Sequence, residues 1–456
     1  MATYRKRKGG YEIRVSAGYD STGKQIMRQF TWHPGNLTPK QEEKELQRQI
    51  VAFEKKVKQG YVIDEKMTFE KYADYVIKLK QRTGAKHRTI ERYTALLVRI
   101  NPAIGFMKLD EIRPAHLNSF YTELLKPKTE RQASAKIDLQ ALIKARKIAL
   151  LIISKACGIS ASTLRGAYSK PVTMETAGGW ATALGGKVTD YFKVAESQAV
   201  LSNKTVLEYH RLISTIMEQA EKEMLIPYNP AHRATPPKLI KKDPNYFQPE
   251  TVGAIREALE LEPLKWKTAT HLLLLSGCRR GEILGLKWAK VNFKSCTIII
   301  DNALLYSADI GIYEDTPKTK TSVRSIKLPA ETMDLLAAWK REQTRQRIAS
   351  GDIWTYTDFV FTKDNGQPMH PDSLTDWLGK FSRRHDLPHI NPHAFRHTMA
   401  SLLYFNGVDS VTISKRLGHS KVSTTSDIYA HVIKQADEQA ADCLGDIILH
   451  RHVSAG

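Results

Sequence analysis

The stretch NPHAFRHTMA, residues 391–400, decides how the rest of the chain is interpreted. It predicts the opening of a helix on which His393 and Arg396 stand three residues apart, a spacing that puts both side chains on one side of the helix. On its own, such a pair is most often an ordinary surface feature. Its meaning therefore depends on which other residues accompany it along the chain.

Four other motifs supply further basic side chains and a tyrosine. Residues 275–288 have the sequence LSGCRRGEILGLKW, and residues 316–324 have the sequence TPKTKTSVR. Downstream come RLGHS at 416–420 and DIYAH at 427–431, which place Tyr429 ten residues after His419 and 33 residues after Arg396. Two arginines, a lysine, two histidines and a late tyrosine together form a set suited to holding a phosphodiester and attacking it with a phenol.

Each residue type has a chemical role in such a reaction. Guanidinium groups present planar, paired donors and keep their charge, so we assign Arg279 and Arg396 to the two non-bridging phosphate oxygens as the phosphorus becomes five-coordinate. Tyrosine has a pKa of about 10 and needs a base or a strongly positive site to attack. Tyr429 is the candidate nucleophile, and His393 is the candidate base because imidazole titrates near neutrality.

The leaving deoxyribose oxygen also needs a proton. Lys318 is the candidate general acid, with its pKa lowered by the neighbouring arginines, and Lys320 and Lys327 are nearby alternatives. His419 is expected to donate a hydrogen bond to the phosphate or to help position the tyrosine.

Glu282 is the candidate orienting carboxylate, since it follows Arg279 by three residues and would share a helix face with it. The same residues could instead form a capped junction between a loop and a helix. A single tyrosine near a C-terminus is likewise more often a packed aromatic. The functional interpretation rests on the ordered combination, with LGHS between the second arginine and the tyrosine.

The order and local sequences of these motifs resemble the tyrosine recombinase (phage integrase) family. Similar integrases have the same Pro-Lys-Thr sequence around the lysine that corresponds to Lys318. The resemblance implies a transesterification through a 3′-phosphotyrosyl intermediate, a Holliday junction, and four protomers that exchange strands in pairs. The family chemistry requires neither a metal nor a nucleotide, so we expect no cofactor.

The composition agrees with a polyanionic partner. The 456 residues include 69 Lys and Arg against 48 Asp and Glu, which gives a net charge of +21 and a pI near 9.6. Ribosomal and membrane-surface proteins are also basic, so charge alone decides little. The four cysteines form no CxxC pair, which argues against a zinc site or disulfide framework and for a reducing cytoplasm. No apolar run is long enough to span a bilayer, and the basic start at residues 4–8 lacks the apolar region of a signal peptide.

The chain is predicted to be multidomain and mainly α-helical with small β-sheets. Residues 1–62 are expected to form a small sheet and a helix, because the patterns at residues 11–16 and 24–32 predict strands and residues 38–43 begin a helix. The family resemblance implies that this sheet has three strands. Residues 66–240 are expected to form an all-α, SAM-like core-binding domain. Residues 245–456 are expected to form an α+β catalytic domain, joined to it by the basic linker at 238–244.

The first of these domains resembles the arm-type DNA-binding domain of lambda-like and conjugative-transposon integrases. We expect one face of its sheet to enter a major groove. The alternative is a solvated, charged sheet face without a ligand. The side chains expected on the DNA-binding face are Arg5, Arg7, Arg14, Lys24 and Arg28.

An insert at residues 127–201 separates two helices of the core-binding domain. Within it, Ser154, Gly158 and Leu164 have helix-turn-helix spacing, because a small residue permits close helix crossing and glycine takes the turn. The stretch resembles phage-repressor-type helix-turn-helix domains, and Arg165 is its candidate DNA-binding residue, with Ser160 and Ser162 beside it. A helical insertion used only for packing or for protomer contacts is the alternative.

We therefore expect a site-specific recombinase that integrates and excises a mobile element in a bacterial cytoplasm, associated with the nucleoid when bound to DNA. The expected partners are duplex DNA at core and arm-type sites, three further copies of the chain, a directionality factor and a host DNA-bending protein, but no membrane. One alternative function is that of a type IB topoisomerase, which uses similar groups but does not exchange strands between sites. A second is that of a non-catalytic DNA-binding regulator in which the insert recognises the DNA.

One further segment, residues 432–445, predicts an amphipathic helix after the tyrosine. The family resemblance implies that this helix docks on a neighbouring protomer, and packing on its own domain is the alternative.

Overall fold

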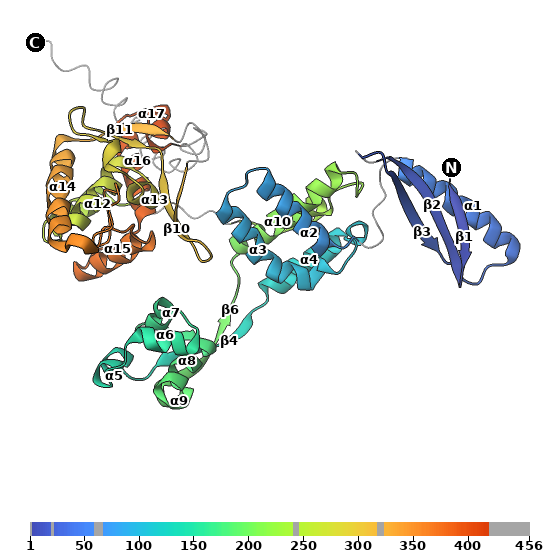
Figure 1. Ribbon diagram of the computed structural model, residues 1–456, viewed down its shortest axis with the longest axis horizontal. Helices are drawn as coiled ribbons and strands as arrows, with labels where there is room; N and C mark the ends of the chain where they lie inside the picture. Colours follow the sequence, from blue (N-terminus) through green and yellow to red (C-terminus); the bar gives the residue numbers. More distant parts are fainter. Residues whose placement is uncertain (1, 20–21, 59–66, 240–245, 317–322, 419–456) are drawn as a thin grey trace, which may run out of the picture. The chain divides into compact units, whose positions relative to one another are not determined.

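The structure is a computed structural model that describes residues 2–19, 22–58, 67–239, 246–316 and 323–418. Internal contacts divide the chain into two units, Met1–Ile240 and Lys241–Gly456 (Figure 1). The fold is mainly helical with small sheets, as the sequence predicts. Within the described ranges, no helix combines the length and the apolar composition that crossing a membrane requires.

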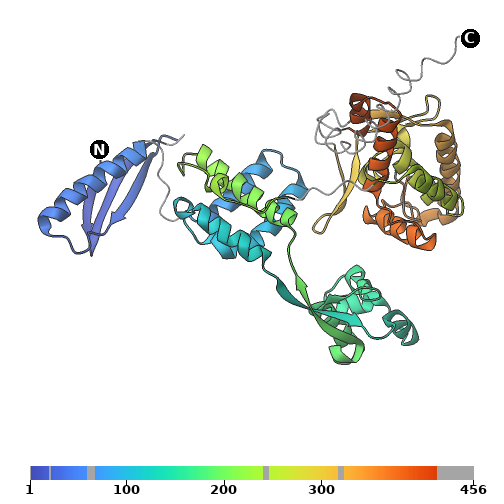
Figure 2. The same cartoon turned by 180° about the vertical axis from the view of Figure 1, so that it is seen from behind.

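The N-terminal part of the first unit is a three-stranded antiparallel sheet covered on one face by a helix (Figures 1 and 2). Its core forms because alternate residues of the central strand, including Ile13 and Val15, face apolar side chains of the helix such as Leu46 and Phe53. The elements are β1 (Thr3–Arg7), β2 (Gly10–Tyr19), β3 (Gln25–Trp32) and α1 (Pro39–Lys58).

A helical bundle follows, with one continuous apolar core. Its helices are α2 (Phe69–Arg82), α3 (His87–Ile100), α4 (Pro114–Leu125) and α10 (Asn203–Lys222), with short turns η1 (Asn101–Gly105), η2 (Leu109–Glu111) and η3 (Pro230–Arg233). The last bundle helix ends at Lys222. Asn229, just before η3, caps its first turn by accepting a hydrogen bond from the Ala231 amide at 2.9 Å.

The insert is a separate small module with its own apolar core around the buried Trp180. A two-stranded ribbon of β4 (Lys128–Ala135) and β6 (Phe192–Ala199) carries five helices and the short strand β5 (Val172–Thr173). The helices are α5 (Leu139–Ala145), α6 (Leu150–Cys157), α7 (Ala161–Gly166), α8 (Met174–Leu184) and α9 (Val188–Tyr191). The turn between α6 and α7 confirms the predicted helix-turn-helix.

The second unit packs helices around one large core, with a small sheet of strand order β11-β8-β7 and a hairpin of β9 and β10. In this sheet, residues 324–327 pair antiparallel with residues 297–300. The helices are α11 (Pro249–Leu259), α12 (Leu264–Ser276), α13 (Arg280–Leu284), α14 (Ala330–Ser350), α15 (Asp372–Arg384), α16 (Pro392–Phe405) and α17 (Ser410–Leu417). The strands are β7 (Val291–Asn292), β8 (Thr297–Ile300), β9 (Ala303–Ser307), β10 (Gly311–Asp315) and β11 (Arg324–Lys327), and the short turns are η4 (Trp288–Lys290) and η6 (Gly351–Ile353).

Candidate active site

Arg279 lies in the tight connection between α12 and α13. The connection begins at Gly277, whose φ of +65° is a conformation that favours glycine; an added Cβ would also lie 2.1 Å from the methyl group of Met399, which would have to move. Glu282 then accepts two hydrogen bonds from Arg279, one from its backbone N–H and one from its Nη1, each at 2.9 Å. The carboxylate thus caps α13 and fixes the arginine at once, while 44% of the Arg279 side chain stays exposed for a ligand.

Arg279 precedes α13 and does not lie within it, so the expected shared helix face is replaced by a cap. The predicted contact between Arg279 and Glu282 nevertheless forms.

Arg396 approaches the same connection from α16, where it is buried. Its Nη1 donates to the carbonyl oxygen of Gly277 and its Nη2 to that of Leu417, both at 2.7 Å. Burial and the nearby charge of Arg279 lower the pKa of Arg396 to about 10. The guanidinium therefore remains charged at neutral pH, and it has donors left for an anion because an arginine carries five N–H groups.

His393 stands one turn before Arg396 on α16, after the cap that Asn391 forms with the Ala394 amide at 2.9 Å. The imidazole loses part of its hydration there and lies near the positive charges of Arg396 and Arg279, and both effects hold its pKa below the ordinary value. It is consequently neutral at physiological pH, which is the form that accepts a proton.

Arg324 is a member of this cluster to which sequence analysis assigned no role. It begins β11, its side chain is only 6% exposed, and its Nη2 donates to Glu282 Oε2 at 2.7 Å. Its Nε donates to the carbonyl oxygen of Arg416 at 2.7 Å. Arg324 therefore connects the carboxylate that holds Arg279 to the end of α17. The only signal in the sequence was its place as the last residue of TPKTKTSVR.

The two arginines also determine the state of Glu282. Burial alone would raise the pKa of this carboxyl, but the hydrogen bonds and charge of Arg324, together with the charge of Arg279, lower the pKa below its ordinary value. Glu282 is thus an ionised acceptor between two cations. Cys278 lies beside them, fully buried, and burial raises the pKa of its thiol, so it is a packing residue and no nucleophile.

The end of α17 is held by several bonds to this cluster. Arg416 donates from Nη2 to the carbonyl oxygen of Leu275 at 2.8 Å and to that of Lys327 at 3.2 Å. Gly418 has a φ of +66°, and a Cβ there would lie 2.9 Å from Arg324 Nη1. The backbone that leads to His419 is therefore fixed against β11 and the Arg279 connection.

Three of the predicted catalytic residues, Lys318, His419 and Tyr429, lie outside the described residues. The structure does bear on one alternative lysine. Lys327 is exposed on the opposite face of β11 from the buried Arg324 and Ile326, because side chains alternate along a strand. It therefore points away from the arginine cluster, which leaves Lys318 and Lys320 as candidates.

The register of the N-terminal sheet corrects the predicted DNA-binding face. Arg5 pairs with Glu12 and Arg14 with Thr3, so Arg5, Arg7 and Arg14 share the open face. Arg28 pairs with Val15, which is buried under α1, and it therefore lies on the other face. Lys24 is exposed in the turn before β3.

Glu12 lies between two of these open-face arginines. Its carboxylate accepts from Arg14 at 2.8 Å and from Arg7 at 2.9 Å. Those bonds lower the pKa of Glu12 below its ordinary value.

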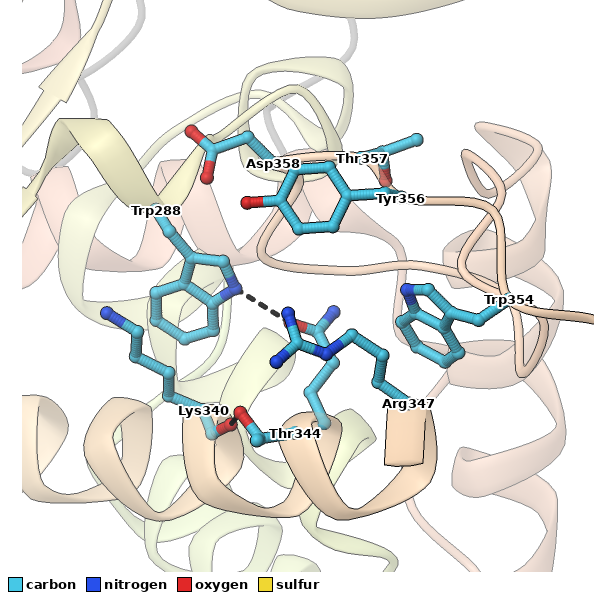
Figure 3. Close-up of a pocket in the computed structure, with 9 residues that line it drawn as sticks. Trp288, Lys340, Thr344, Arg347, Trp354, Tyr356, Thr357 and Asp358 are labelled. Atoms are coloured by element: carbon cyan, nitrogen blue, oxygen red, sulfur yellow. Dashed lines mark hydrogen bonds between the residues drawn. The ribbon is translucent and has the colours of Figure 1, made fainter. Parts of the chain in front are cut away.

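Two other features of the described residues lie apart from the arginine cluster. Glu218, Glu221 and His232 have ligand atoms close enough to share a metal ion, but they also tie α10 to η3, with His232 Nε2 3.4 Å from Glu218. A pocket of about 190 Å³ lies against α14 in the second unit (Figure 3). Several of its lining side chains bind one another, because Trp288 donates a hydrogen bond to Gln343 at 2.7 Å and Lys340 lies over the Trp288 ring. The pocket shares no lining residue with the arginine cluster.

Comparison with known proteins gives one consistent result. Residues 245–436 match the phage integrase family, and residues 68–125 match the N-terminal SAM-like domain of phage integrases. The ICEBs1 integrase of Bacillus subtilis is 30% identical over 271 residues, which cover 58% of this chain and 70% of that protein. A XerC-like tyrosine recombinase of Caldanaerobacter subterraneus is 29% identical over 266 residues, covering 54% of this chain and 67% of that protein.

Among solved structures, the Tn1549 transposon integrase in complex with a circular intermediate DNA has the same fold. It superposes with a TM-score of 0.55 at 18% identity, covering 82% of this chain and 99% of that chain.

Proposed function

This chain belongs to the phage integrase family of tyrosine recombinases, and we infer that it is a tyrosine-type site-specific recombinase of a mobile genetic element. The substrate is duplex DNA, which fits both the net charge of +21 and the exposed donors of the arginine cluster. The enzyme cuts and rejoins strands without hydrolysis, because a phosphotyrosyl link keeps the energy of the broken bond for the reverse attack.

The observation that carries the proposal is the arrangement of Arg279 and Arg396 around Gly277. One arginine is held by Glu282 and the other by two backbone carbonyls, so neither has to be reorganised when the phosphate becomes five-coordinate. His393 lies on the same helix as Arg396 with a lowered pKa, which suits a proton acceptor.

The remaining roles are assigned on the same chemical grounds. Tyr429 attacks the phosphorus and becomes joined to the 3′ end, while Lys318 gives a proton to the departing 5′ oxygen. His419 donates a hydrogen bond to the phosphate, and the fixed backbone at Gly418 supports that role. Residues 66–240 would hold the core site together with the catalytic domain 245–456. Residues 1–62 would bind arm-type sites through Arg5, Arg7 and Arg14, with Lys24 beside them.

Four copies of the chain would assemble on the DNA. A groove of about 690 Å³ between α12, β11, α16 and α17 supports this assembly, because apolar side chains line most of it. They include Leu275, Leu328, Met399, Leu402 and Leu403. We assign the groove to contact with a neighbouring protomer, and we expect a directionality factor and a host DNA-bending protein to act on the assembled complex in the bacterial cytoplasm.

Covalent trapping on a nicked DNA substrate tests this function. The substrate carries an end of the element with a nick near the crossover, so that the cleaved strand leaves and the enzyme stays attached. Wild type should form an adduct at the 3′ side of the break, whereas Tyr429→Phe should bind equally well and form none. Tight binding without an adduct on any end fragment would identify a non-catalytic regulator instead.

A further inference from the structure

We propose that the inserted module, residues 128–199, is an additional DNA-reading module that binds duplex DNA next to the core site through α7. This goes beyond the recombination chemistry, which uses residues of the second unit.

The helix-turn-helix is held rigidly. Helix α6 ends at Gly158, whose φ is +68°, and Ser160 caps α7 by accepting from the Thr163 amide at 3.1 Å. Behind the turn, Gly179 of α8 comes so close that an added Cβ would lie 2.8 Å from Ile159. Trp180 donates its indole N–H to the carbonyl oxygen of Leu164 at 3.1 Å. These contacts hold α7 against both α6 and α8.

The outer face of α7 is polar while its inner face is apolar. Leu164 and Ala167 are buried, whereas Thr163 and Arg165 are exposed, and Ser169 and Lys170 continue the exposed surface beyond the helix. In helix-turn-helix proteins the second helix lies in the major groove, where hydroxyl and guanidinium groups can reach base edges or phosphates. The exposed side chains here are of those types.

The charge of the module complements a polyanion. Residues 128–199 contain 11 Lys and Arg against 5 Asp and Glu, so the net charge is +6 (11 minus 5). Lys155 on α6 and Lys144 on α5 are exposed along with Arg165 and Lys170, so cations are present on and around the helix-turn-helix. Counterion release from DNA would favour binding by such a surface.

The ribbon limits where the DNA contact can occur. Strands β4 and β6 pair along all eight residues, from Lys128 opposite Ala199 to Ala135 opposite Phe192. Eight strand residues extend about 26 Å, which is shorter than one DNA turn of about 34 Å. The ribbon starts directly after α4 and returns directly before α10, two helices of one bundle core. The module should therefore reach a segment within about one to two DNA turns of the core site.

One feature favours a different ligand. Leu151 and Ile152 on α6 are each 61% exposed, and an apolar pair of this kind would also suit a protein partner. The charge of the module and the polar face of α7 favour DNA over a protein partner.

Hydroxyl-radical footprinting of the full-length chain on labelled duplexes from the two ends of the element tests the proposal. The chain carries Tyr429→Phe, so the result does not depend on the cleavage chemistry. We expect a protected segment flanking the core site that disappears when Arg165→Glu and Lys170→Glu are combined, with core and arm protection retained. Affinity for the flanking segment should fall roughly tenfold or more.

A charge-matched control combines Lys187→Glu and Lys193→Glu. Lys187 is the exposed residue just before α9, Lys193 is exposed on β6, and both lie outside the helix-turn-helix. It should keep all three protected regions. A footprint without a flanking segment, or one that survives the Arg165 and Lys170 changes, would overturn the proposal. The flanking protection could survive the Arg165 and Lys170 changes while the double variant Leu151→Ser, Ile152→Ser fails to assemble the tetramer. In that case the module binds protein and the proposal fails.

Discussion

Two carboxylates in this chain each lie between two arginines, and their surroundings differ. The buried triad of the second unit is Arg279–Glu282–Arg324, and the surface triad of the N-terminal sheet is Arg7–Glu12–Arg14. The distances between guanidinium nitrogen and carboxylate oxygen are alike, at 2.9 and 2.7 Å in the buried triad and 2.9 and 2.8 Å in the surface triad. The side chain of Arg324 is 6% exposed, however, against 47% for Arg14.

This difference determines what each triad can do. Removing a charge from the buried triad leaves a neighbouring buried charge with less compensation and little access to water, whereas water replaces a lost partner in the surface triad. The buried triad can therefore fix a geometry, and the surface triad can leave its arginines available to a ligand.

The largest expected effect is that of Arg324→Met. It leaves Glu282 ionised and buried with only Arg279 beside it, so the second unit should lose about 3–5 kcal/mol of unfolding free energy, measured by urea denaturation. Adduct formation on the nicked substrate should be lost as well. Arg14→Met is the matched control in the surface triad, and it should change neither measurement on a nicked substrate that carries the core site alone.

A double variant separates stability from positioning. Replacing Arg324 and Glu282 together by Met removes both buried charges, so the unfolding free energy should return towards wild type. Cleavage should stay lost, because nothing then holds Arg279. Wild-type cleavage by this double variant would show that the buried triad is only a packing element.

Arg279→Lys should have the next largest effect, on catalysis alone. An ammonium group cannot hold two phosphate oxygens in a fixed fork, so cleavage should slow by about 10²–10³-fold in a single-turnover assay. The Arg279 side chain is 44% exposed, so stability and non-covalent DNA binding should be retained. Arg280→Lys, which changes an arginine paired with Asp372, is the control with little expected loss. Normal cleavage by Arg279→Lys would refute the assignment of this arginine to the phosphate.

The lowered pKa of His393 gives a smaller, pH-dependent effect. The free imidazole pKa is about 6.5, and partial burial and the cations lower it in the folded protein, so the neutral base persists as the pH falls through that value. The acid limb of the cleavage profile should therefore lie below about 6.5. Arg280→Gln removes one of these cations and should move the limb upward, whereas Arg384→Gln, which pairs with Glu262, should not. An acid limb above 6.5 in wild type would exclude His393 as the base.

Sequence analysis identified the parts of this site that local spacing defines. The contact between Glu282 and Arg279 follows from a separation of three residues, and the helix-turn-helix follows from Gly158 and its neighbours. Arg324 was not assigned, because its partner Glu282 is 42 residues away and its second acceptor is the carbonyl of Arg416, 92 residues away. Such contacts depend on how β11 pairs with β8, which no local pattern specifies.

The failures in the first unit have a similar origin. Arg28 was assigned to the DNA-binding face together with Arg5, Arg7 and Arg14. Which face of the sheet a residue occupies depends on the register set by the preceding turn, and the pairing shifts between Ser16 and Tyr19. The ribbon at 128–135 and 192–199 was missed because its strands are almost wholly exposed and lack the apolar alternation that marks a half-buried strand.

The smallest effect is expected for Glu12→Gln in the surface triad. The amide keeps the shape of the carboxylate but removes its charge, so Arg7 and Arg14 lose an ionic partner that solvent can replace. The thermal midpoint should stay within about 2 °C of wild type. Arm-site DNA should bind a few-fold more tightly at low salt, and the gain should vanish as salt is raised, because the open face has lost a negative charge.

Arg14→Gln should act in the opposite direction, weakening arm binding and reducing the slope of log affinity against log salt by about one. Glu282→Gln makes the same chemical change in the buried triad and should instead destabilise the second unit, because Arg324 then lies buried without a counter-charge. If Glu12→Gln destabilised the N-terminal sheet as much as Glu282→Gln destabilises the second unit, the exposure of the arginines would not explain the difference between the two triads. Glu12 itself is largely covered by its two partners, with only 10% of its side chain exposed. The exposure of the arginines, and not that of the carboxylate, is therefore what this pair of variants tests.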